Sequence, residues 1–155
     1  MTRMLPNLGM AISMLLAFAS AQSQATNPRF GQWKLKSDAQ APASNIMTYE
    51  RFGAKGMKVT VTSVNARAEK SEWWYTTEFD GKDMPVTGST GTTHTSVRTI
   101  TDRINEIVNK RDGKVTQVLT NVLSPDGNTI AVIYMRDDGA GNTTAVSFAT
   151  YERIR

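Results

Sequence analysis

The chain has 155 residues and a formal net charge of +4, with one histidine and no cysteine. The absence of cysteine excludes a disulfide framework and a thiol nucleophile, and a single histidine leaves too few ligands for a zinc site. Its 18 basic residues are scattered and not clustered, which argues against a nucleic-acid-binding stripe. We therefore expect one domain held together by an ordinary apolar core, without a cofactor or a metal.

The first 21 residues have the pattern of a secretory signal peptide. Arg3 precedes an apolar run from Leu8 to Phe18, and the small residues Ala19-Ser20-Ala21 follow. A run of this length suits the core of a signal peptide and is too short to span a bilayer. We expect cleavage before Gln22, with Ser23-Gln24-Ala25 as a less favoured second site before Thr26. Cleavage leaves a periplasmic or secreted bacterial protein without a stable membrane anchor. An uncleaved membrane anchor is the alternative.

The rest of the chain, residues 22–155, alternates between stretches rich in Val, Ile, Thr and aromatic residues and short turn sequences. The predicted strands lie within residues 27–37, 46–52, 57–64, 72–79, 84–86, 95–101, 103–110, 115–123, 129–136 and 143–154. Four Asp-Gly pairs separate the later stretches: Asp80-Gly81, Asp112-Gly113, Asp126-Gly127 and Asp138-Gly139. Asp-Gly favours a tight hairpin because the central residues of such a turn need positive φ.

This spacing predicts an all-β domain, an antiparallel meander of about nine or ten strands with no helix between them. An open sheet of that size would leave two unpaired edges, and closure removes both. We therefore favour a single barrel over an open sandwich.

Catalytic groups are scarce in the sequence. His94 has Ser89 and Ser96 near it in the chain, but it falls in a polar stretch and we expect it to be solvated. The Asp residues of the Asp-Gly pairs are already explained by turn geometry. We therefore expect a protein that is not an enzyme, with a barrel isomerase or hydrolase as a minor alternative.

The most aromatic strand covers residues 72–79. Alternation places Trp73, Tyr75 and Phe79 on one face and Trp74 on the other, between glutamates. The first face should point inward, either as core packing or as the lining of a ligand cavity. Trp74 should point outward, either packed under the amino-terminal segment or in contact with a protein partner.

Arg51 follows Met47 and Tyr49 on one alternating face of its strand. In one register it points into the barrel, where its planar guanidinium would bind a carboxylate ligand. In the other register it lies on the surface, which is the favoured alternative.

Several motifs together resemble small exported bacterial proteins of the lipocalin-like, calycin-type class. They are Gly31-Gln32-Trp33 (a G-x-W strand), the stretches 79–88, 111–115 and 124–128, and the closing Tyr151-Glu152-Arg153. The resemblance covers the chain from about Gly31 to Arg153. It implies a lipocalin/fatty-acid-binding-like barrel that binds a small apolar or amphipathic ligand inside. It also implies that Trp33 packs beneath Arg153 in a cation–π contact.

Our leading hypothesis is an exported, non-enzymatic barrel that carries a small hydrophobic or amphipathic ligand. The candidate lining residues are Tyr49, Arg51, Val59, Val61, Trp73, Tyr75, Phe79, Tyr134 and Phe148. The rival hypothesis is a structural or protein-interaction module of the cell envelope whose interior is filled. A lumen of about 300–1,000 Å³, the range of ligand pockets, would favour the carrier.

Overall fold

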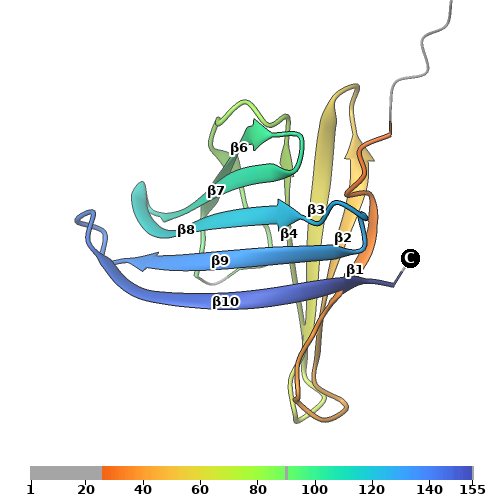
Figure 1. Cartoon of the computed structure of the whole chain (residues 1–155). Helices are drawn as coiled ribbons and strands as arrows, with labels where there is room; N and C mark the ends of the chain where they lie inside the picture. The colour runs from red at the N-terminus through yellow and green to blue at the C-terminus, as the bar shows by residue number, and fades with distance from the viewer. Residues whose placement is uncertain (1–25, 90, 155) are drawn as a thin grey trace, which may run out of the picture.

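The computed structural model describes residues 26–89 and 91–154, so the predicted signal peptide lies outside the described residues. Within that part of the chain, ten antiparallel strands form one continuous sheet (Figure 1). The strands are β1 Gly31–Leu35, β2 Ser44–Phe52, β3 Gly56–Val64, β4 Lys70–Thr77, β5 Met84–Pro85, β6 His94–Thr101, β7 Ile104–Arg111, β8 Lys114–Leu123, β9 Thr129–Asp137 and β10 Thr143–Arg153. None of the described residues forms a helix that is long and apolar enough to cross a membrane.

The sheet closes into a barrel. Each strand pairs with its neighbours in sequence, except that β4 and β5 are not joined in the main ladder, and β1 also pairs with β10. The seam between the two edges is closed by Trp74 and Thr87, whose backbones exchange hydrogen bonds of 2.9 and 3.0 Å. In Figure 1, β8–β10 run at a steep angle to β1–β3, because the sheet coils strongly as it closes. The predicted all-β meander barrel is confirmed.

Gly88 allows the seam to form. It follows Thr87 in the chain and has a φ of +85°. A Cβ at this position would collide with the backbone oxygen of Glu72 on β4. Only glycine combines this left-handed conformation with so close an approach to β4.

The four Asp-Gly pairs do not all form the tight hairpin that the dipeptide predicts. Asp112 and Gly113, at φ of +50° and +79°, make a two-residue loop between the paired Arg111 and Lys114. At the other three pairs only the glycine has positive φ, and the connections are longer. In these loops the aspartate accepts backbone N–H groups, as Asp126 Oδ1 does from Asn128 at 3.0 Å.

Trp33 and Arg153 close one end of the barrel. The Trp33 side chain is fully buried, at 0% exposure. Its indole N–H donates to the backbone oxygen of Arg29 at 2.9 Å, and the Arg153 guanidinium lies 4.1 Å from the ring centre. Arg153 also donates to the backbone oxygen atoms of Gly127 and Phe30, at 2.9 and 2.8 Å. The cation–π contact implied by the family resemblance is confirmed.

Candidate functional site

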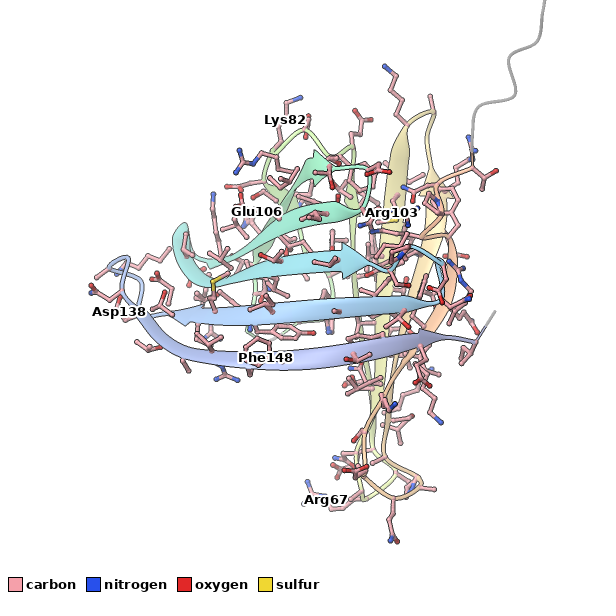
Figure 2. The ribbon with its side chains drawn as sticks, in the orientation of Figure 1. Arg67, Lys82, Arg103, Glu106, Asp138 and Phe148 are labelled. Atoms are coloured by element: carbon pink, nitrogen blue, oxygen red, sulfur yellow. The ribbon has the colours of Figure 1, made fainter. Side chains whose placement is uncertain are left out.

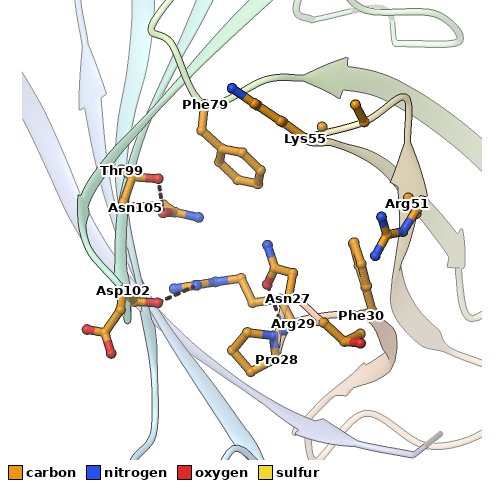
Figure 3. Close-up of a pocket in the computed structure, with 13 residues that line it drawn as sticks. Asn27, Pro28, Arg29, Phe30, Arg51, Lys55, Phe79, Thr99, Asp102 and Asn105 are labelled. Atoms are coloured by element: carbon orange, nitrogen blue, oxygen red, sulfur yellow. Dashed lines mark hydrogen bonds between the residues drawn. The ribbon is translucent and has the colours of Figure 1, made fainter. Parts of the chain in front are cut away.

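Two cavities occupy the barrel. The lumen cavity, of about 170 Å³, is lined by Asn45, Met47, Tyr49, Val59, Val61, Trp73, Tyr75, Ile107, Asn109, Gln117, Leu119, Asn121, Val132, Tyr134 and Tyr151. The end cavity, of about 420 Å³, is lined by Thr26, Asn27, Pro28, Arg29, Phe30, Arg51, Ala54, Lys55, Gly56, Phe79, Thr99, Asp102 and Asn105 (Figure 3). No residue lines both cavities.

The lumen cavity gathers six of the nine side chains predicted to line a ligand site. They are Tyr49, Val59, Val61, Trp73, Tyr75 and Tyr134. Antiparallel pairing sets Tyr49, Val59 and Tyr75 in one row across β2, β3 and β4. Strand alternation points all three inward, as the sequence pattern indicated.

Trp73 and Tyr75 stack within this wall, with ring centres 6.1 Å apart and planes 15° from parallel. Trp74 points outward, as predicted from its position between glutamates. It is half-buried, and the Lys58 ammonium lies over its ring, 4.8 Å from the centre. The two adjacent tryptophans therefore report on opposite sides of the barrel wall.

The opposite wall of the lumen is polar, which the sequence analysis missed. Asn109 on β7 and the β8 residues Gln117 and Asn121 face inward. Asn109 Nδ2 donates to Gln117 Oε1 at 3.1 Å, and the Thr95 hydroxyl donates to Asn109 Oδ1 at 2.7 Å. Gln117 and Asn121 stand two positions before and after the inward-facing Leu119 on β8, and this alternation could have revealed that they face the lumen.

Four tyrosines surround the lumen, and burial shifts their titration. Burial raises the pKa of Tyr49 to about 12, although the hydrogen bond from Asn121 opposes the shift. Burial also raises the pKa values of Tyr75, Tyr134 and Tyr151, so all four phenols are neutral at physiological pH. Among the described residues, no lysine, arginine, aspartate or glutamate lines this cavity. The lumen is therefore polar in places but uncharged.

Two polar groups in the lumen wall have unused hydrogen-bonding capacity. Asn45 Nδ2 donates to the Ser63 hydroxyl at 2.8 Å, but the buried Asn45 Oδ1 has no hydrogen-bond partner among the described residues. The Tyr75 hydroxyl makes no hydrogen bond with the described part of the chain either. An unpaired buried acceptor costs about 1–3 kcal/mol, which a bound donor would recover.

Three predicted site residues lie outside the lumen. Arg51 is exposed and, like Phe79, lines the end cavity. Phe148 was wrongly predicted to line the site, because it lies on the outer face of β10 with 77% of its surface exposed (Figure 2). It pairs with Ile133, whereas the next residue, Ala149, pairs with the buried Val132. The register between β9 and β10 therefore directs Ala149 inward and Phe148 outward.

Arg29 separates the two cavities and was not predicted. Its side chain is 3% exposed, and its guanidinium donates to the backbone oxygen atoms of Asp102 and Arg103, at 3.2 and 2.6 Å. Its Nε also donates to Asn121 Oδ1 at 3.4 Å, and Asn121 Nδ2 donates to the Tyr49 hydroxyl at 3.3 Å. Burial lowers the pKa of the Arg29 guanidinium. This polar chain forms the floor between the lumen cavity and the end cavity.

His94 is exposed and begins β6 instead of lying in the preceding polar stretch. Its Nδ1 lies 3.2 Å from the Thr93 hydroxyl oxygen. Over residues 26–89 and 91–154, no three His, Asp or Glu side chains converge on a point that could hold a metal ion.

Comparison with known proteins supports the fold. No family model matches the sequence, and no curated protein matches it. Among solved structures, the crystal structure of wild-type fluorescent protein UnaG aligns with a TM-score of 0.54 at 14% identity, over 81% of this chain and 96% of that chain. A UnaG mutant aligns with a TM-score of 0.56 at 13% identity, over 83% and 97%. At these identities the likeness shows the β-barrel fold alone.

Proposed function

We propose that this protein is a binding protein whose lumen holds one small, compact and uncharged ligand. The observation that carries the proposal is the lumen cavity itself, in which an aromatic wall faces an amide wall and Asn45 Oδ1 is left without a donor. Binding pockets combine a mainly apolar lining with a few placed polar groups in this way.

The volume of the lumen limits the size of the ligand. At about 170 Å³ it lies below the range of about 300–1,000 Å³ that would favour a carrier of drug-sized ligands. The interior is nonetheless far larger than the space for one water molecule, about 10–15 Å³. A compact aromatic molecule suits this space, whereas a long acyl chain does not.

The polar groups define where such a ligand would be held. Tyr75 lies in the same cross-strand row as Tyr49. Asn45 precedes Tyr49 on β2 by two inward-facing positions, so it lies nearer to the start of that strand. A ligand with a donor directed at Asn45 Oδ1 and an acceptor near the Tyr75 hydroxyl would use both unpaired groups. Simple phenols and aromatic amides have this chemistry. The proposal involves binding alone and no chemical step.

Single-tryptophan variants test this proposal. One variant keeps only Trp73, on the lumen face, and the other keeps only Trp74, with Trp33→Phe in both to preserve an aromatic ring at the barrel end. Phenol, benzamide and indole should change the fluorescence of the Trp73 variant and leave the Trp74 variant nearly unchanged. Circular dichroism must first show that both variants fold. If neither responds to any of the three probes, the filled-core interaction module becomes the better hypothesis.

Native mass spectrometry of the protein purified from its own host gives an independent test. A retained compact molecule would support the proposal and would identify the ligand. Loss of that adduct in a Tyr75→Phe, Asn45→Leu variant would locate it in the lumen.

The export of the protein is a separate part of the proposal and depends on the pattern of residues 1–21. Amino-terminal sequencing of protein recovered from the cell envelope should find Gln22 or Thr26 first. Recovery of the chain with Met1 intact would contradict cleavage.

A further inference from the structure

The end cavity differs from the lumen cavity in both size and charge. It is the larger of the two, at about 420 Å³, and it lies on the other side of the Arg29–Asn121–Tyr49 floor. Residues from the amino-terminal segment, the β2–β3 turn and the β6–β7 turn surround it (Figure 3). It therefore requires an explanation other than the proposed function of the lumen.

Positive charge predominates around this cavity. Arg29, Arg51 and Lys55 line it, against the single carboxylate of Asp102. None of the ion pairs found among the described residues includes any of these three cations, whereas Asp102 pairs with Arg103 at 3.9 Å. The Asp102 side chain is itself largely exposed to solvent. The described residues around the cavity thus carry more cations than carboxylates, and none of these three cations forms an ion pair with them.

Two phenylalanine rings provide an apolar surface beside these cations. The Arg51 guanidinium lies 5.9 Å from the centre of the Phe30 ring, and the Phe79 ring projects into the cavity from the opposite side (Figure 3). Lys55 extends along the rim toward Phe79. Aromatic faces next to cationic groups suit a flat ring that bears an anionic substituent.

Phe79 is held in a backbone conformation that bulky residues avoid. Its φ is +63°, and its backbone N–H donates to the Thr77 hydroxyl at 2.9 Å. Such a conformation costs about 1–3 kcal/mol and is concentrated at functional sites and ligand clamps. Because β4 ends at Thr77, the strand itself does not impose this conformation. The strained backbone directs the ring into the end cavity.

We propose that the end cavity is a second binding site, which takes a small organic anion with a flat aromatic body. Arg51 binds the anionic group through its planar donor fork, and Lys55 adds a point charge. Arg29, whose donors already serve backbone oxygen atoms and Asn121, contributes its charge without leaving its place in the floor. Phe30 and Phe79 hold the ring. Carboxylate and phosphate share this chemistry, so the site is selective for charge and shape.

Paired probes of equal shape test the charge requirement. Naphthoate and its uncharged isostere naphthamide are titrated separately into the purified protein, and NMR follows the backbone amides and the arginine side-chain Nε–H groups. We expect naphthoate to bind at least about tenfold more tightly than naphthamide, which corresponds to about 1.4 kcal/mol. The shifts should centre on Arg51, Lys55 and Phe79 and leave Trp73 in the lumen unchanged. Equal binding of the two probes, or no naphthoate-induced shift at millimolar concentration, would overturn the proposal.

Charge-removing variants locate the binding. Arg51 and Lys55 are exposed, so an Arg51→Gln, Lys55→Gln variant is expected to fold normally. It should bind naphthoate at least about tenfold more weakly, as expected for the loss of a charge-assisted pair. The Lys34→Gln, Lys58→Gln variant is the matched control, because it also removes two positive charges and neither residue lines the cavity. An equal loss of affinity in the control would show that the effect comes from the overall charge of the protein, and would contradict a site at Arg51 and Lys55.

The two binding sites can fail independently. The fluorescence of Trp73 with uncharged probes tests the lumen proposal. The NMR signal of the Arg51 side chain with an anionic probe tests the end-cavity proposal. Naphthoate shifts confined to Trp73 and Tyr75 would place the anion in the lumen and refute a second site.

Discussion

Replacement of Trp33 with alanine tests how the barrel end is held together. The indole is completely buried, donates to the Arg29 backbone oxygen at 2.9 Å, and carries the Arg153 guanidinium 4.1 Å from its centre. Truncation of a buried tryptophan typically costs about 3–5 kcal/mol. The oxygen atom left without its donor adds about 1–3 kcal/mol, and the lost cation–π contact about 0.5–2 kcal/mol. Because these contributions overlap, we expect the free energy of unfolding to fall by at least about 4 kcal/mol.

Urea denaturation followed by circular dichroism measures this loss. Native domains are stable by only about 5–15 kcal/mol, so the variant should unfold at a much lower urea concentration. Trp74→Ala is the matched control, because it removes the same side chain from a half-buried position outside the barrel. We expect the control to cost less than about 2 kcal/mol. A loss of less than about 1 kcal/mol in Trp33→Ala would refute the argument that this residue closes the barrel end.

Three further changes test the seam, the buried phenols and the outer face. Gly88→Ala should destabilise the fold by at least about 2 kcal/mol, because it combines left-handed backbone strain with a collision against β4. Gly81→Ala, which has positive φ but open space around it, should cost only about 1 kcal/mol in the same urea titration. Above a pH of about 10 the tyrosines of the unfolded chain lose their phenolic protons, whereas folded Tyr49 keeps its proton until a pH of about 12. The free energy of unfolding should therefore fall by up to about 1.4 kcal/mol per pH unit for each buried tyrosine. Tyr75→Phe should make that decline less steep, and an unchanged slope would show that Tyr75 is not buried in solution. Phe148→Ser should change stability by less than about 0.5 kcal/mol and lower aggregation in light scattering, since the ring is exposed; a large loss of stability would contradict its outward position.

The strands were predictable because their signal is local. Alternation with a period of two identifies a half-buried strand without knowledge of its partners. The same alternation correctly separated Trp73 from Trp74 and placed Tyr75 inward. The pairing of Trp33 with Arg153 could be expected from the family resemblance, although the two residues are 120 positions apart in the sequence.

Features that depend on pairing between strands could not be predicted in this way. Phe148 and Ala149 are both plausible inward residues by composition, and only the register with β9 decides between them. Three of the four Asp-Gly pairs similarly form wider loops than the dipeptide alone predicts.

The sequence by itself therefore determined the class of fold, the number and order of the strands and the aromatic wall of the lumen, all of which follow from short-range alternation. Only the tertiary structure divided the interior into an uncharged lumen and a cationic end cavity. That division depends on Arg29, which is remote in sequence from Asn121 and from the β6–β7 turn that it contacts. A guanidinium can be buried there because chain closure brings three oxygen acceptors to it, and such acceptors leave no pattern in the sequence around Arg29.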